Sequence, residues 1–90
     1  MTRQDRIVHS ISRLVSKGLF AEAQTALASA LARYPDNGPL WWLRGIAAYR
    51  RADFDRARRA LEHAGLLVPL DARTQCLLAD AYARTGYPRQ

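Results

Sequence analysis

Residues 38–71 read GPLWWLRGIAAYRRADFDRARRALEHAGLLVPLD, and related sequence flanks this stretch at an offset of 34 positions. Sliding the chain against itself by that distance places Phe20 on Phe54 and Pro35 on Pro69. The further matches are Ala23 with Ala57, Leu27 with Leu61, Ala30 with Ala64, and the series Gly18, Ala52, Gly86. Internal repetition with a period of about 20–50 residues is typical of stacked repeat proteins. We therefore predict repeats over 4–37, 38–71 and 72–90, the last one partial, within a single domain over residues 1–90.

The apolar residues within each repeat have helical spacing. One example is the series Ala23, Ala26, Leu27, Ala30 and Leu31, which recurs every three or four positions, and the alternation expected of a strand is absent. Turn signals divide the chain between these series, so we predict five helices near 5–17, 21–33, 39–51, 55–67 and 72–85.

Several residues at the predicted turns suit helix ends. Gly18 can adopt the left-handed conformation that ends a helix, and Pro39 suits a first helical position. Asp53 and Asp71 are predicted to cap the helices that follow them.

The middle repeat resembles the tetratricopeptide repeat family, whose unit is two antiparallel helices in 34 residues. The residues that carry the resemblance are Trp41, Gly45, Tyr49, Phe54, Ala57, Ala64 and Pro69. It implies an all-α fold of about two and a half repeats, with five antiparallel helices in a right-handed superhelical stack. Arg44 departs from the pattern because the family usually has leucine there. Leu43 falls one place early and Tyr49 one place late, so we expect the first helix of this repeat to be somewhat rotated.

Small and aromatic residues have a predicted packing role. Small side chains at Gly45, Ala57, Ala64 and Ala79 would let helices approach closely, while Phe20, Trp41, Phe54 and Tyr82 fill the spaces between them. We interpret both sets as structural.

Composition narrows the possible partners and compartment. The 90 residues carry a formal charge of +6, almost entirely from arginine, which favours anionic partners or simply reflects solvated helix faces. The single cysteine, Cys76, cannot form an internal disulfide, and we expect it to be a small buried hydrophobe in a cytoplasmic protein. The longest apolar run, GLLVPL, is too short for a membrane span.

No arrangement of residues indicates catalysis. His9 and His63 fall in different predicted helices, and no serine is flanked by the glycines of a nucleophile elbow. The sequence also lacks a glycine-rich loop of the kind that binds phosphate. We therefore predict that the chain is not an enzyme and has no catalytic, cofactor-binding or metal-binding residue.

The predicted binding surface is the concave face, which the first helix of each repeat lines in this architecture. The resemblance places in this groove Val8, Ser12, Trp42, Leu43, Ile46, Tyr49, Arg50, Arg73, Leu77 and Arg84, with Val15, Cys76 and Asp80 beside them. Trp42 is the most informative, because Trp41 already occupies the position that the family buries. Its indole is predicted to face the groove, or else to pack on the adjoining helix or against a following domain. Family members that clamp a terminal carboxylate use lysine, asparagines and arginine here, and only Arg73 fits that pattern.

We predict a protein-interaction scaffold, adaptor or chaperone that binds a peptide or helix, apolar with acidic flanks, in this groove. One alternative is an amino-terminal module that positions the substrate of a larger enzyme. Another is an anionic or nucleic-acid binder that uses Arg50, Arg51, Arg56, Arg58 and Arg59. Nucleic acid is the less favoured ligand because interleaved exposed aromatics are missing.

The partial third repeat leaves three possibilities open. Pro88 stands where the repeat has its second-helix aromatic. The fifth helix could close the array, the chain could be the amino-terminal part of a longer protein, or the fifth helix could pair with a second copy.

Overall fold

The computed structural model describes residues 1–86, which form five α-helices and no strand. The helices are α1 (Arg3–Ser16), α2 (Phe20–Arg33), α3 (Gly38–Arg50), α4 (Phe54–Leu67) and α5 (Ala72–Arg84). The predicted all-α class and number of helices are confirmed, and each predicted boundary is within two residues of the observed one. Pro88, where we expected the repeat pattern to break, lies outside the described residues.

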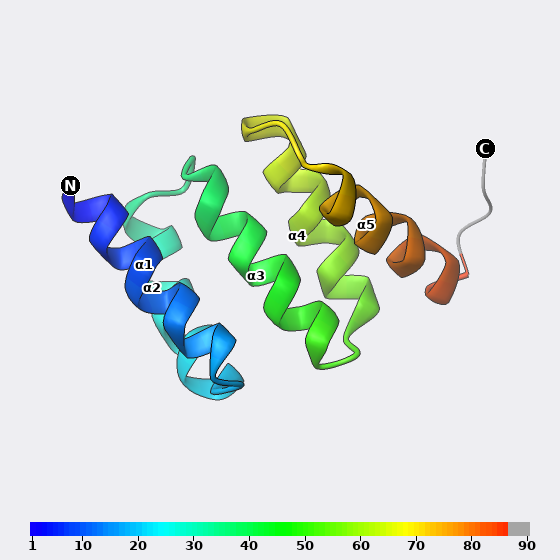
Figure 1. Cartoon of the computed structure of the whole chain (residues 1–90), viewed down its shortest axis with the longest axis horizontal. Helices are drawn as coiled ribbons and strands as arrows, with labels where there is room; N and C mark the ends of the chain where they lie inside the picture. Colours follow the sequence, from blue (N-terminus) through cyan, green and yellow to red (C-terminus); the bar gives the residue numbers. More distant parts are fainter. Residues whose placement is uncertain (87–90) are drawn as a thin grey trace.

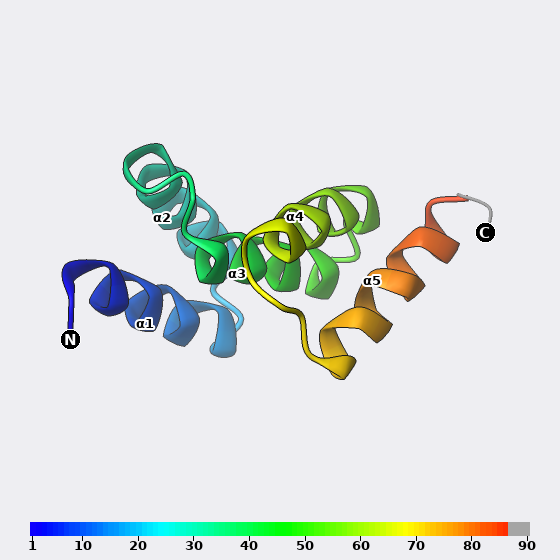
Figure 2. The same cartoon turned by 90° about the horizontal axis from the view of Figure 1, so that it is seen from above.

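The helices form successive antiparallel neighbours (Figure 1). α3 and α4 make the most extensive helix–helix contact, α3 also contacts α1 and α2, and α5 packs on α4. Seen from above, α1, α3 and α5 lie along one side of the molecule while α2 and α4 lie along the other (Figure 2). This alternation places the first helix of each predicted repeat on a common side.

Side chains cap four of the five helices. Asp53 and Asp71 accept hydrogen bonds from the backbone N–H groups of Arg56 and Thr74, which confirms both predicted caps. α3, however, begins one residue before the predicted start, because Asn37 accepts from the backbone N–H of Leu40 and Pro39 falls at the second helical position.

The cap of α1 was not predicted. Thr2 and Asp5 form a reciprocal capping box, in which each side chain accepts a hydrogen bond of 3.1 Å from the other's backbone N–H. A threonine followed three residues later by an acid was the available sequence signal.

The turn that follows the first helix of each repeat has the same backbone conformation in all three copies. Gly18, Ala52 and Gly86, aligned by the 34-residue offset, have φ angles of 76°, 63° and 80°. Glycine adopts this left-handed conformation without strain, whereas alanine does so at a free-energy cost. The repeat therefore extends to the backbone even where the residue type changes.

Small residues bring α3 and α4 together as predicted. Gly45, Ala57 and Ala64 are all buried, and a Cβ atom on Gly45 would lie only 2.5 Å from Cδ2 of Leu61. Ala79 was predicted to have the same role in α5 and is exposed instead, since no described helix packs beyond α5. The fully buried alanine of α5 is Ala81.

Candidate partner-binding groove

A hollow of about 590 Å³ lies between α3 and the start of α5. Its lining consists of Trp42, Ile46, Tyr49, Arg50, Asp71, Arg73, Thr74 and Leu77. Six of these are among the ten residues predicted to line the groove. The spacing 42, 46, 49 repeats at about one helical turn, which is why these α3 side chains share a face.

Trp42 both lines the hollow and packs on the neighbouring helix. Its indole N–H donates a 2.9 Å hydrogen bond to Oγ1 of Thr74, a side chain that is almost completely buried on α5. The ring is half-buried and contacts the core. Trp42 thus both lines the hollow and packs on α5, two of the placements expected for it.

Tyr49 is held by a chain of polar contacts to α5. Its hydroxyl donates to the Asp80 carboxylate, which also accepts a 2.7 Å hydrogen bond from Nε of Arg84. The hydrogen bond from Tyr49, followed by that from Arg84, lowers the pKa of Asp80 below its ordinary value. The same bond to Asp80 raises the pKa of Tyr49, because it stabilises the protonated phenol. The Arg84 guanidinium lies 4.9 Å from the ring centroid of Phe54. Arg84 therefore positions Tyr49 and does not itself line the hollow.

The basic side chains of the hollow lie on both helices. Arg50 donates a 3.0 Å hydrogen bond to the Val15 carbonyl and lies 5.4 Å from the Phe20 ring centroid, so its position is fixed from α1 and α2. Arg73 is exposed on α5. It contributes to the lowered pKa of Asp71, although the main cause is hydrogen bonding from Thr74.

Leu43 and Val15 do not belong to the groove, and their predicted placement was wrong. They are 2% and 4% exposed and form part of the core between α1, α2 and α3. Leu43 shares a helix face with the buried Leu40 and Ala47, three before and four after it, and not with its chain neighbour Trp42.

The remaining predicted groove residues lie elsewhere. Val8 and Ser12 are half-buried on α1 and do not line this hollow. Cys76 is exposed, contrary to the prediction of a buried thiol, because the buried face of α5 is the one that carries Thr74 and Ala81.

The arginine stretch around the α3–α4 turn is not one cationic patch. Arg58 forms ion pairs with Asp55 and Glu62, and Arg59 pairs with Asp55 at 2.7 Å. Arg50 lies at the hollow between α3 and α5. The two other arginines of the stretch, Arg51 and Arg56, line a different surface.

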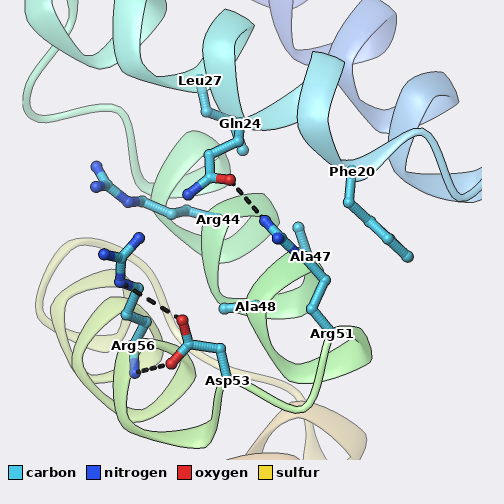
Figure 3. Close-up of a pocket in the computed structure, with 9 residues that line it drawn as sticks. All are labelled: Phe20, Gln24, Leu27, Arg44, Ala47, Ala48, Arg51, Asp53 and Arg56. Atoms are coloured by element: carbon cyan, nitrogen blue, oxygen red, sulfur yellow. Dashed lines mark hydrogen bonds and ion pairs between the residues drawn. The ribbon is translucent and has the colours of Figure 1, made fainter.

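That surface is a second, smaller hollow of about 40 Å³, which the sequence analysis did not predict. It is enclosed by α2, α3 and α4 and lined by Phe20, Gln24, Leu27, Arg44, Ala47, Ala48, Arg51, Asp53 and Arg56 (Figure 3). Arg44, Ala48 and Arg51 recur at the same spacing as the groove residues of α3. This spacing in the sequence indicates that the three residues share a helix face. Nothing in the sequence indicated that residues of α2 would complete the hollow.

Metal sites and membrane spans are two further possibilities for residues 1–86. No group of three or more histidine, cysteine, aspartate or glutamate side chains there could hold a metal ion. None of the five helices is long and apolar enough to cross a membrane. His63 packs against Trp41, with its ring centroid 4.1 Å from that of Trp41.

Paired helices that repeat every 34 residues, with a hollow on the side of the first helices, define a helical-repeat scaffold. A family model described as tetratricopeptide repeat matches residues 14–81, and the chain belongs to this family. No curated protein and no solved structure gave a significant match. The family is typically non-catalytic, and the chain is accordingly a protein–protein interaction module.

Proposed function

We propose that the chain is an adaptor or chaperone that binds a peptide or helix of a partner protein in the groove between α3 and α5. The observation that carries this proposal is the 590 Å³ hollow, whose lining combines aromatic, aliphatic and arginine side chains. Tryptophan, tyrosine and arginine are the residue types most enriched where binding energy concentrates.

The preferred partner segment has apolar residues at its centre. Trp42, Ile46 and Leu77 are each half-buried, so their apolar surface is partly satisfied by the fold and partly open to the hollow. Covering the remaining apolar surface would release free energy at about 25 cal/mol per Å². The indole of Trp42 is already oriented by Thr74, and this limits the entropy that it would lose on binding.

The flanks of the segment are acidic. Arg50 and Arg73 outnumber the one acid of the lining, Asp71, and both arginine side chains are exposed. Such charges increase the association rate with an anionic partner and disfavour a cationic one. A cytoplasmic location, inferred from the unpaired cysteine, is part of the same proposal.

The test is selection of peptides from a random display library on the full chain, followed by affinity measurement with purified variants. We expect the selected peptides to share an apolar centre with aspartate or glutamate beside it. Trp42→Ala should weaken their binding by about 30-fold or more, as expected for loss of a hot-spot residue worth about 2 kcal/mol. Trp42→Phe keeps a ring in the hollow and should retain part of the affinity.

Leu66→Ala is the matched control for loss of apolar surface. Leu66 is 83% exposed on α4, away from the groove, so it reports nonspecific hydrophobic binding. Equal weakening by Trp42→Ala and Leu66→Ala, with both variants folded by circular dichroism, would overturn the groove proposal. Selected peptides that lack acidic residues would overturn the assignment of the flanks.

A further inference from the structure

Three arginine residues line the smaller hollow. Arg44 and Arg51 belong to α3 or its carboxyl end, Arg56 belongs to α4, and all three are exposed residues. In Figure 3 the Arg51 side chain points toward Gln24 of α2, whereas the Arg44 side chain extends away from Arg51. The floor is apolar and includes Leu27 and Ala47, both buried.

Only part of the donor capacity of these arginines is used within residues 1–86. Arg51 donates a 2.6 Å hydrogen bond to Oε1 of Gln24, and Nε of Arg56 lies 3.5 Å from the Asp53 carboxylate. The Arg44 guanidinium lies 5.5 Å from the Trp41 ring centroid and has no hydrogen bond or ion pair to a described residue. A guanidinium carries five N–H donors, so most of the donors around the hollow are available.

The repeat itself marks Arg44 as unusual. The positions aligned with Arg44 at the 34-residue offset are Ser10 and Leu78, neither of which is charged. The change to arginine puts a third cation at a hollow whose other cations come from the α3–α4 turn and the start of α4. The lining then contains three arginines and one carboxylate, a net charge of +2.

From this arrangement we propose that the hollow binds a phosphate-class dianion, either free phosphate or the phosphoryl group of a partner. A phosphorylated side chain carries a charge of about −1.5 to −2 at neutral pH and three acceptor oxygens, which matches the net charge of the lining and the several N–H donors that its arginines leave unused within residues 1–86. A carboxylate has two oxygens and a single charge, and one arginine satisfies it.

The experiment is isothermal titration of the full chain at low ionic strength, at a pH where phosphate is mainly the dianion. Inorganic phosphate, O-phosphoserine and acetate are titrated separately. We expect saturable binding of one or both phosphate probes and a much weaker response to acetate. Tighter binding of O-phosphoserine would assign the site to a partner's phosphoryl group, and tighter binding of inorganic phosphate would assign it to the free anion.

Two pairs of variants separate a built site from general attraction by net charge. Arg44→Leu installs the residue found at the aligned position 78 and should weaken phosphate binding about tenfold or more, the usual effect of losing a hydrogen bond to a charged group. Arg59→Leu makes the same change in net charge at a residue already paired with Asp55 and should have less than about a twofold effect.

The second pair removes a negative charge. Asp53→Asn retains an effective helix cap while taking the one carboxylate of the described lining out of the hollow, so it should strengthen phosphate binding, whereas Asp36→Asn, in the α2–α3 turn, should not. Absence of saturable binding, equal response to acetate, or equal effects within either pair of variants would each overturn the proposal.

Discussion

Substituting Gly45 tests the close approach of α3 to α4. An alanine Cβ at this position would lie 2.5 Å from Cδ2, 2.6 Å from Cγ and 3.2 Å from the backbone nitrogen of Leu61. Alanine in place of glycine stabilises a helix by about 1 kcal/mol, but forcing a methyl group into a close-packed site costs about 1–3 kcal/mol. Gly45→Ala should therefore lower the free energy of unfolding by up to about 2 kcal/mol.

Gly65→Ala is the matched control, because Gly65 lies in α4 and the nearest atom to its Cβ would be the end of the Leu70 side chain at 3.3 Å. This flexible group can move, so the helix preference should dominate and raise stability by about 0.5 kcal/mol. Urea unfolding followed by far-ultraviolet circular dichroism measures both variants. If Gly45→Ala were as stable as Gly65→Ala, the argument from the Leu61 contact would be refuted.

The Leu61→Ala background identifies the contact responsible. Loss of this fully buried side chain should cost about 2–5 kcal/mol by itself, but it removes the two closest atoms to the new Cβ. Gly45→Ala should then become neutral or stabilising. An unchanged effect of Gly45→Ala in that background would show that Leu61 is not what excludes the methyl group.

Two further outcomes follow from the backbone and from the Tyr49–Asp80 pair. Ala52→Gly should raise the free energy of unfolding by up to about 1 kcal/mol, because it relieves a left-handed alanine with φ 63°, and a lower urea midpoint would contradict this. Since the folded pKa of Asp80 lies below its ordinary value of 3.8, its contacts contribute stability above that pH, and this contribution is lost as the pH falls through the folded pKa. Tyr49→Phe removes the largest cause of the lowered pKa. The melting temperature of the wild type should therefore exceed that of the variant at neutral pH, and the difference should vanish in acid. A difference that does not depend on pH would contradict the proposed contribution of Asp80.

The sequence was sufficient to predict the number and bounds of the helices because those depend on local chemistry. Asp53 and Asp71 cap the predicted helices because an acidic side chain just before a helix can accept hydrogen bonds from its first free backbone N–H groups. Gly18 and Gly86 ended helices for a similarly local reason. Ala52 shows the limit of residue type alone, because alanine rarely adopts the left-handed conformation and its conformation was not predicted.

The groove was predictable in part, and the errors have a common cause. Successive residues of a helix point about 100° apart, so a face assigned one residue out of place moves a side chain from groove to core. Leu43 was misplaced in this way, since its burial is decided by contact with α1 and α2. Cys76 was misplaced because the face of α5 that packs is set by Thr74 and Ala81 of the same helix.

The arginine hollow was not predictable from periodicity, because three helices build it. The basic stretch in the sequence included Arg58 and Arg59, which form ion pairs with acidic residues of α4. It omitted Arg44, which lines the hollow. Proximity in sequence therefore selected the wrong cations. Only the packing of α2 against α3 places Gln24 beside Arg51 and defines where an anion would be held.

The central helix, α3, links the two sites while keeping them apart. Trp42 and Ile46 face one hollow. Arg44 and Ala48, each two positions further along the helix, face the other. An offset of two residues turns a helix face by about 200°, so the two stripes lie on nearly opposite sides of the same rod. An occupant of the groove between α3 and α5 therefore leaves the hollow between α2, α3 and α4 uncovered. Ligands in the two hollows would accordingly approach α3 from nearly opposite sides.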